Sequence, residues 1–467
     1  MFVGRERELK DLRELISSRG SNIAVVYGRR RIGKSELIRT SLEGEKALFF
    51  EGLEGKTKGQ QMDSFLLQLS LQLGSERKKF KTWTEAFHHL FTLLKDNPHH
   101  LVFDEFQWLA NYKKGVVSEL KLIWDQYLSR IEGLTLVLCG SIASFMIKQV
   151  IKSNALYGRT SLSIHLKGLS LKEANQILGD KGENELALAY MVAGGVPKYL
   201  EVLAQASSIE IALQKNAFRE NGYFVEEFER IFTSHFGKSD DYRNILTVLS
   251  QHSNGLFHKE MADACEISTG GRFSDLLFNL ESAGFIFKYT PVNVSVNSKL
   301  IKYTLSDPYL RFYFSMIKPN LPEIKSNQNI FSQLTQAGVY FDWRGKAFEC
   351  MCIEHAYAIA KILEFSGVSY RVGPYFESSR QHGVGVQVDL LFDRADNVMT
   401  LCEMKYTQGT VGVSVIDEVE RKVEILRRKF PKKTIQKVLV SHHAPSQHLQ
   451  ESGYFYRYIS SSELMTL

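Results

Sequence analysis

Short apolar runs alternate with helical patterns over about the first 165 residues of the chain. The runs are rich in Val, Leu and Phe and are bounded by polar segments: Asn22–Tyr27, Ala47–Phe50, His100–Asp104 and Thr135–Cys139. The helical stretches between them are Gln60–Leu73, Thr84–Leu94 and Val117–Ile131. Buried strands that alternate with helices predict an α/β domain whose parallel sheet is covered on both faces.

Residues 170–236 have a helical pattern only. Ser170 and Glu173 have the spacing of a capping box at the start of a helix. Gly194-Gly195 ends another helix, and Pro197 stands at the start of the next one. We therefore expect a small helical lid after the first domain.

A third block contains three helical patterns and then a two-strand pattern: Tyr242–Ser250, His258–Cys265, Phe273–Ala283, Phe285–Thr290 and Lys302–Leu305. Three helices and a hairpin predict a winged helix-turn-helix. Its third helix carries few of the side chains that read DNA, so DNA binding and a packing or relay role both stay open. Lys288, Lys299 and Lys302 are the candidate phosphate contacts of the wing.

The last block is predicted to be an α/β domain of its own. It opens with a helix and continues with four strands and a charged helix: Trp343–Leu363, Ser369–Phe376, Gln387–Phe392, Met399–Lys405, Ile435–Val440 and Val415–Phe430. Two prolines and several polar residues before it indicate a linker. The predicted order is the first α/β domain at 1–168, a lid at 169–238, a winged helix at 239–318, a linker at 319–340 and the last domain at 341–467.

Composition narrows the class of protein. Of the 467 residues, 44% are hydrophobic and 24% charged, which excludes a disordered or low-complexity chain. The net charge of +6 permits a nucleic-acid partner without demanding one. The five cysteines show no paired framework, which favours reduced thiols in a cytoplasmic protein. No apolar run is long enough for a membrane helix, so no membrane partner is expected.

The segment 28–35, GRRRIGKS, fits the phosphate-binding pattern G-x-x-x-x-G-K-[ST]. Its glycines let the loop curl, so that backbone N–H groups surround the phosphates. Lys34 is expected to reach the β and γ oxygens, and Ser35 to coordinate Mg²⁺. The predicted nucleotide-binding residues of this loop are Gly28, Arg31, Ile32, Gly33, Lys34 and Ser35.

Acidic residues follow a second apolar strand and complete the predicted site. Asp104 is placed to hold the Mg²⁺ shell, and Glu105 to polarise an attacking water, which indicates hydrolysis. Ser141, at the tip of the neighbouring strand, is the candidate sensor of the γ-phosphate. Arg159 either stabilises the transition state, in cis or for a neighbouring subunit, or is a solvated or salt-bridged arginine.

Together these motifs resemble the archaeal-type AAA+/STAND ATPases over about residues 1–236. The resemblance rests on the opening FVGREREL, the phosphate loop, Asp104-Glu105, Tyr157-Gly158-Arg159 and the segment 194–197, GGVP. It implies that the opening segment lies against the adenine of ATP, with Pro197 on the opposite side. The implied adenine contacts are Val3, Gly4 and Arg5.

Two carboxylates and a lysine of the last domain can come together on one face of the predicted sheet. A hairpin can bring Asp389 near Glu403, and Lys405 shares the strand face of Glu403. Such a group would bind Mg²⁺ and position water for attack on a phosphodiester. The alternative is a cross-strand salt bridge on a half-exposed sheet. Residues 421–437 add eight basic side chains, which either contact phosphates or form a solvated helix face.

The order helix–strand–turn–strand with these residues resembles the PD-(D/E)xK nuclease fold. By that resemblance Asp389 and Glu403 are metal ligands, Lys405 is the catalytic lysine, and Glu349 is an accessory acid that also binds the metal. Val388 stands in place of the usual proline, so the motif is less specific here.

The sequence thus predicts an ATP-binding and hydrolysing switch coupled through a winged helix to a Mg²⁺-dependent nuclease-like domain that acts on nucleic acid, DNA before RNA. The alternative is a regulatory or signalling ATPase that binds DNA or protein and whose nuclease-like domain is inactive. A homo-oligomer and a protein trigger stay open as further partners.

Overall fold

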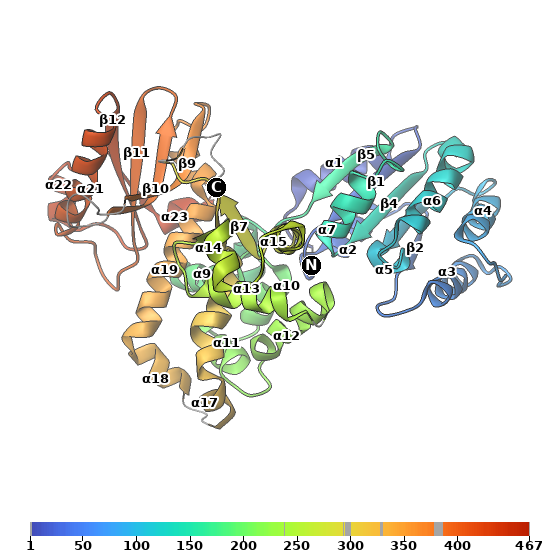
Figure 1. Cartoon of the computed structure of the whole chain (residues 1–467), viewed down its shortest axis with the longest axis horizontal. Coiled ribbons are helices and arrows are strands. Elements are labelled where there is room, and N and C mark those ends of the chain that lie inside the picture. The colour runs from blue at the N-terminus through green and yellow to red at the C-terminus, as the bar shows by residue number, and fades with distance from the viewer. Residues whose placement is uncertain are drawn as a thin grey trace. The chain divides into compact units, whose positions relative to one another are not determined.

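The computed structural model describes residues 2–237, 239–292, 294, 300–326, 330–377 and 386–466. The chain divides into two compact units, Met1–Leu169 and Ser170–Leu467, and each is described by itself (Figure 1). In the described ranges, every helix is too short or too polar to cross a membrane. All five cysteines are free thiols.

The first unit is built on a five-stranded sheet with the order β2-β3-β4-β1-β5, in which all neighbours are parallel. Its strands are β1 (Asn22–Tyr27), β2 (Ala47–Glu51), β3 (His100–Asp104), β4 (Thr135–Gly140) and β5 (Thr160–His165). The first four confirm the α/β prediction. The fifth was not predicted, because its side chains alternate between exposed and half-buried or buried positions and form no apolar run.

Helices cover this sheet: α1 (Glu6–Ile16), α2 (Lys34–Ser41), α3 (Lys58–Leu73), α4 (Trp83–Leu94), α5 (Phe106–Leu109), α6 (Lys114–Gln126) and α7 (Ala143–Phe145). A 3₁₀ turn at Leu128–Arg130 and a π-helical turn at Met146–Ile151 complete the unit. Thr57 and Thr82 each close a capping box, which fixes where α3 and α4 begin.

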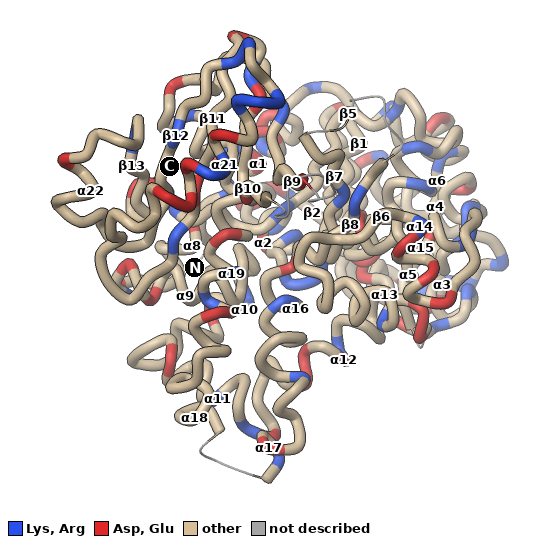
Figure 2. Tube along the Cα trace, turned by 60° about the vertical axis from the view of Figure 1, so that its left-hand side comes forward, with Lys and Arg blue, Asp and Glu red and all other residues tan. Residues whose placement is uncertain are grey.

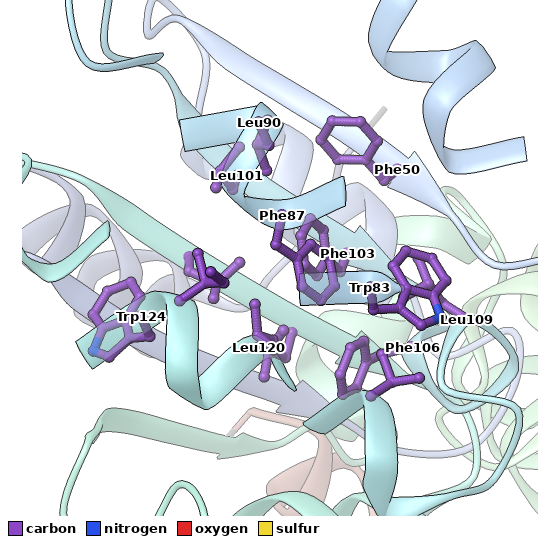
Figure 3. Packing of buried hydrophobic residues seen from close by; sticks show 14 of the residues in the cluster. Phe50, Trp83, Phe87, Leu90, Leu101, Phe103, Phe106, Leu109, Leu120 and Trp124 are labelled. Atoms are coloured by element: carbon purple, nitrogen blue, oxygen red, sulfur yellow. The ribbon is translucent and has the colours of Figure 1, made fainter. Parts of the chain in front are cut away.

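A cluster of buried aromatic rings packs β2 and β3 against α3 and α4 (Figure 3). The Phe65 ring lies 4.5 Å from that of Phe50 and 5.9 Å from that of Phe103. Phe87 stacks on Phe103 at 5.8 Å, and Trp83 is fully buried beside them. Because Phe103 directly precedes Asp104, this packing fixes the end of β3 at which the predicted site begins.

The second unit opens with helices only: α8 (Leu171–Leu178), α9 (Glu183–Ala193), α10 (Pro197–Ala204), α11 (Ile209–Ala217) and α12 (Tyr223–Phe236). The predicted capping box of Ser170 and Glu173 is present at the start of α8. A mixed region follows, with α13 (Asp240–Ser250), β6 (Leu256–Phe257), α14 (His258–Ala264), α15 (Gly271–Ser282), β7 (Ile286–Tyr289) and β8 (Lys302–Leu305). Its three strands are antiparallel in the order β6-β8-β7.

Helices continue through the segment that was predicted as a linker. They are α16 (Pro308–Phe312), a π-helical turn (Tyr313–Ile317), a 3₁₀ turn (Lys318–Asn320), α17 (Leu321–Ser326), α18 (Ile330–Gln336), α19 (Gly338–Glu354) and α20 (Ala356–Ile362). The predicted helix at the start of the last domain is therefore two helices, since the chain turns at His355.

The second unit ends in a mixed five-stranded sheet with the order β13-β12-β11-β10-β9. Its strands are β9 (Tyr370–Glu377), β10 (Val386–Arg394), β11 (Val398–Lys405), β12 (Thr434–Ser441) and β13 (Arg457–Ser460). The first three pair antiparallel, and β11, β12 and β13 pair parallel. The remaining helices are α21 (Val415–Lys429), α22 (Gln447–Glu451) and α23 (Ser461–Thr466).

Candidate nucleotide site and a C-terminal charged cluster

The phosphate loop joins the end of β1 to the start of α2. Gly28 has a φ of +155°, and a Cβ at this position would lie 2.3 Å from the carbonyl oxygen of Leu166. Gly33 has a φ of +91° and precedes the first residue of α2, Lys34. Both positions therefore need glycine, the first because of a close backbone neighbour and the second because of its backbone conformation.

Lys34 and Ser35 stand at the N-terminus of α2. The Lys34 side chain is buried, and its Nζ donates to the carbonyl oxygen of Arg29 at 2.9 Å, within the loop itself. Arg31 has a φ of +67° in the same loop, and Ile32 is buried. The N-terminus of a helix with a lysine beside it attracts phosphate groups.

Ser35 Oγ donates a hydrogen bond to Asp104 Oδ2 at 2.5 Å. A hydroxyl and a carboxylate oxygen are the ligands that Mg²⁺ prefers, and they fit this ion because it takes its remaining ligands from waters and substrate phosphates. In the described ranges, no group of three or more His, Cys, Asp or Glu side chains could hold a metal by itself. The donor set thus fits a metal that arrives with a nucleotide.

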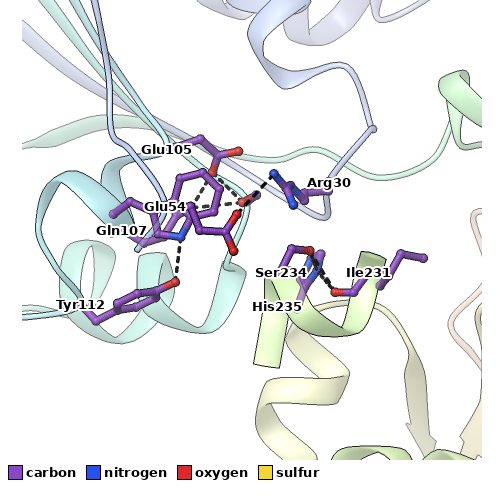
Figure 4. A network of polar contacts seen from close by, with 10 residues as sticks. Arg30, Glu54, Glu105, Gln107, Tyr112, Ile231, Ser234 and His235 are labelled. Atoms are coloured by element: carbon purple, nitrogen blue, oxygen red, sulfur yellow. Dashed lines mark hydrogen bonds and ion pairs between the residues drawn. The ribbon is translucent and has the colours of Figure 1, made fainter. Parts of the chain in front are cut away.

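The Glu105 carboxylate is held by two side chains from neighbouring elements (Figure 4). Its Oε2 accepts from Ser141 Oγ at 2.6 Å and from Gln107 Nε2 at 2.5 Å. Gln107 also donates to Ser141 Oγ at 3.1 Å and is fully buried. The structure therefore brings Glu105 and Ser141 together, as the sequence predicted for the ends of β3 and β4, and adds Gln107, which the sequence analysis did not find.

A third carboxylate lies at the same edge of the sheet. Glu51 pairs with Asp104 in the register of β2 and β3. Burial raises the pKa of Glu51, and the negative charges of Asp104 and Glu105 raise it further. Because the three carboxylates repel one another, a cation at this edge would stabilise all of them.

Arg5 links the opening segment to the phosphate loop. Its guanidinium is buried, and its Nη2 donates to the carbonyl oxygens of Lys167 at 2.5 Å and Ile32 at 3.3 Å. Val3 and Gly4 precede it and are partly buried. Arg5 thus contacts backbone carbonyls, and its Nη1 also lies 4.0 Å from Glu8 Oε1. The implied adenine contacts of Val3, Gly4 and Arg5 stay predictions.

Arg159 forms a two-point ion pair with Asp125, a partner that the sequence analysis did not identify. Its Nε lies 2.6 Å from Asp125 Oδ1, and its Nη2 lies 2.9 Å from Asp125 Oδ2. The hydrogen bond from Arg159 holds the pKa of the Asp125 carboxyl below its usual range. Of the two interpretations left open for Arg159, this geometry is the salt-bridged one. A role in catalysis would require Arg159 to leave Asp125.

Pro197 is the first residue of α10, as its position in the sequence predicted. Gly194 ends α9 with a φ of +57°, and a Cβ at that position would lie 3.0 Å from Pro308 Cγ. The turn before Pro197 is therefore packed against α16 within the second unit.

The predicted C-terminal residues lie around the ends of β10 and β11. Leu390 pairs with Cys402 at the end of the ladder between β10 and β11, and Asp389 and Glu403 are the residues that flank this pair. Burial raises the pKa of Glu349 on α19, and the charge of Asp389 raises it further. Lys346 Nζ lies 2.7 Å from Glu349 Oε2. The structure thus places Asp389 near Glu349, whereas the ion-pair partners of Glu403 are lysines.

Glu403 is the buried centre of a four-membered ion-pair network. Its side chain is 1% exposed, and its two oxygens contact Lys405 Nζ at 2.9 Å and Lys422 Nζ at 2.7 Å. Glu418 joins the two lysines, 2.7 Å from Lys405 Nζ and 3.5 Å from Lys422 Nζ. Lys422 and Glu418, both on α21, were not identified from the sequence as parts of this site.

Most basic side chains of the run at residues 421–437 form ion pairs or a ring contact within the C-terminal domain. Lys429 pairs with Glu377 at 2.8 Å, and Lys433 contacts Asp393. Other members of the run pair with Glu403, Glu420 and Glu424 or lie over the ring of Tyr454. In Figure 2 basic and acidic segments are interspersed around α21. This pattern is that of a salt-bridged helix surface. On the wing, Lys288 pairs with Glu281 at 3.0 Å, and Lys299 lies outside the described residues.

Comparison with known proteins agrees with the first unit's site. Residues 2–203 match the family model of the ATPase domain found predominantly in Archaea. This part of the chain is therefore similar to that family, which supports a P-loop ATPase domain of the archaeal type and implies nucleotide binding.

Two relatives come from Methanocaldococcus jannaschii. The uncharacterized protein MJECL04 is 28% identical over 395 residues, which cover 84% of each chain. The uncharacterized ATP-binding protein MJ0423 is 44% identical over 46 residues, 10% of this chain and 78% of the relative.

Among solved structures, the Walker-type ATPase PABY2304 of Pyrococcus abyssi is 20% identical and has a TM-score of 0.49. That alignment covers 67% of this chain and 96% of the other. The ORC2 protein of Aeropyrum pernix is 14% identical with a TM-score of 0.41, over 72% of this chain and 96% of the other. We draw no conclusion about function from these two similarities.

Proposed function

We propose that the protein is an ATP-hydrolysing switch whose nucleotide state acts on a C-terminal nuclease-like domain that binds nucleic acid. The observation that carries the ATPase part is the hydrogen bond of 2.5 Å between Ser35 Oγ and Asp104 Oδ2, with Glu105 directly after Asp104. It joins the two halves of a nucleotide-hydrolysing site. The location that we propose is the cytoplasm, because all five cysteines are free thiols.

The proposed roles at this site follow from chemistry. Lys34 and the backbone N–H groups of the loop would bind the phosphates, and Ser35 and Asp104 would hold Mg²⁺. Bound there, the metal would neutralise charge on the β- and γ-phosphates. Glu105 would accept a proton from the attacking water, and Ser141 would respond to the γ-phosphate through the contact that it shares with Glu105.

The proposal for the second unit rests on the order of its elements. The region from α13 to β8, with three helices and three short antiparallel strands, supports a winged helix. The order α19, β9, β10, β11, α21, β12 supports the nuclease-like domain, with Asp389, Glu403, Lys405 and Glu349 as its site. DNA is the proposed partner before RNA, through these two parts.

The second candidate is a regulatory ATPase whose nuclease-like domain binds nucleic acid or protein without cutting. A specific observation favours it, because both oxygens of Glu403 contact ammonium groups. A Mg²⁺-dependent nuclease would need at least one of these oxygens for the metal. A cellular-defence protein that cuts only after a trigger would share the same starting arrangement.

Incubation of the full chain with plasmid, linear DNA and RNA separates the two candidates. Each reaction contains Mg²⁺ or Mn²⁺ and either no nucleotide, ADP or ATP. Cutting that Glu403→Ala and Lys405→Ala abolish supports the nuclease. Cutting under no condition, or cutting that these variants leave unchanged, favours the regulator. In parallel, ATP turnover that survives Lys34→Ala would show that the phosphate loop is assigned wrongly.

A further inference from the structure

The charges of the ion-pair network around Glu403 balance one another. Two carboxylates, Glu403 and Glu418, face two ammonium groups, Lys405 and Lys422. Exposure decreases from 47% for the Glu418 side chain to 26% for Lys405, 12% for Lys422 and 1% for Glu403. The most buried charge thus has two opposite charges in contact, which is what a buried carboxylate requires.

The position of Lys422 is fixed by the packing of its helix. Val419 and Val423 are fully buried in the core between α21 and the sheet. Lys422 lies one turn after Glu418 on α21, so both side chains reach the same neighbourhood on β11. The contact between Lys422 and Glu403 is therefore built into the way α21 packs on the sheet.

The predicted metal ligands do not fit a divalent cation in this arrangement. Both oxygens of Glu403 contact lysines, and Lys346 contacts Glu349. Asp389 Oδ1 accepts from Gln387 Nε2 at 3.0 Å. A cation beside Glu403 would stand next to two ammonium groups, and like charges at this distance repel strongly in a buried site.

We propose that Lys422 is the resident cation of the C-terminal site and keeps divalent metal ions away from Glu403. The inference rests on the proposed nuclease-like domain and adds a regulatory element to it. Lys405 belongs to the predicted motif and lies on β11, whereas Lys422 lies outside that motif, on α21, which packs on the sheet. Withdrawal of Lys422 alone would leave Glu403 with a free oxygen and Lys405 in place. The domain is therefore closed to metal until Lys422 is displaced.

Binding of Mn²⁺ alone to the full chain tests the proposal without any nuclease assay. Titration calorimetry is carried out without nucleotide on the wild type and on Lys422→Gln, and each is repeated with Glu403→Gln added. The difference made by Glu403→Gln isolates this site from the phosphate loop. Lys422→Arg keeps the charge, and Lys429→Gln removes a charge from the same helix away from Glu403.

We expect Lys422→Gln to bind Mn²⁺ through Glu403 at least about tenfold more tightly than each of three references: the wild type, Lys422→Arg and Lys429→Gln. A tenfold change in affinity corresponds to about 1.4 kcal/mol. Glu403-dependent binding by the wild type at the affinity of Lys422→Gln would overturn the proposal. So would a folded Lys422→Gln, checked by circular dichroism, that gains no site. If Lys422→Gln does not fold, Lys422→Met, which keeps most of the side-chain length, replaces it. If that variant does not fold either, Glu403-dependent Mn²⁺ binding by the wild type is enough to overturn the proposal.

The outcome is independent of whether the domain cuts nucleic acid. A Mn²⁺ site that appears in Lys422→Gln supports the resident cation even if no variant has nuclease activity. Conversely, a wild type that cuts DNA and binds Mn²⁺ through Glu403 would support the nuclease and contradict the resident cation.

Discussion

Ser35 Oγ donates a hydrogen bond of 2.5 Å to Asp104 Oδ2 and so joins two segments that are 69 residues apart in the sequence. Ser35 lies in the first turn of α2, and Asp104 is the last residue of β3. The sheet order explains the contact, since only β4 lies between β1 and β3. Two oxygen donors thus meet at the edge of the sheet that carries the phosphate loop.

Removal of either partner is expected to uncouple Mg²⁺ from nucleotide binding. In Ser35→Ala and Asp104→Asn the metal loses an oxygen ligand, so Mg²⁺ should strengthen ADP binding less than it does in the wild type. ADP affinity with and without Mg²⁺ measures this. Ser17→Ala is the matched control, because Ser17 is exposed and donates only within α1. An unchanged effect of Mg²⁺ in both site variants would contradict the assignment.

Phe103→Ala is expected to destabilise the first unit by about 3–5 kcal/mol, because it removes a fully buried ring from the aromatic cluster. Three of the four tryptophans, Trp83, Trp108 and Trp124, lie in this unit and Trp343 lies in the other, so fluorescence of a Trp343→Phe background during urea unfolding follows the first unit. Leu71→Ala removes a side chain that is 74% exposed on α3 and should change the stability by less than about 0.5 kcal/mol. Equal effects of the two substitutions would show that the cluster does not support β3.

The stability of the second unit is expected to fall as the pH drops from about 6.5 towards 4. His442 Nδ1 lies 2.8 Å from Ser461 Oγ, and its Nε2 lies 2.5 Å from Asn184 Oδ1. Burial, with the nearby His443 and Arg344, lowers the pKa of His442 to about 4. An unfolded histidine titrates near 6.5, so between these values the unfolded chain binds more protons, and acid favours unfolding.

Urea unfolding followed by circular dichroism at pH 7.5 and pH 5 measures this dependence. His442→Gln should reduce the loss of stability at the lower pH, because it removes the group that takes up the proton. His448→Gln, on the exposed surface of α22, should leave the loss unchanged. The same loss in His442→Gln as in the wild type would refute this explanation.

The sequence was sufficient wherever a local pattern determines the structure. Apolar runs predicted β1 and β3, and the loop pattern located Lys34 and Ser35 at the start of a helix. Strand β5 was not predicted, because its polar side chains form no apolar run. Strand β13 was not predicted either, because it is only four residues long.

Contacts between distant residues were beyond the sequence patterns. Gln107 belongs to the Glu105 contact and Asp125 to the Arg159 pair, yet neither lies in a recognisable motif. Lys422 looked like one basic residue in a run of eight until the packing of α21 placed it on Glu403. Charge spacing along one helix does not indicate which strand residue it meets.

Steady-state ATP turnover by the wild type and Glu105→Gln tests the central claim, that this chain hydrolyses ATP at the end of β3. Loss of a general base lowers a rate by about 10²–10⁴-fold, so Glu105→Gln should lose turnover by this order while still binding ATP. Glu54→Gln, an exposed neighbour whose carboxylate lies 4.0 Å from Arg30, should keep the wild-type rate. No turnover by the wild type, or wild-type turnover by Glu105→Gln, would contradict the account.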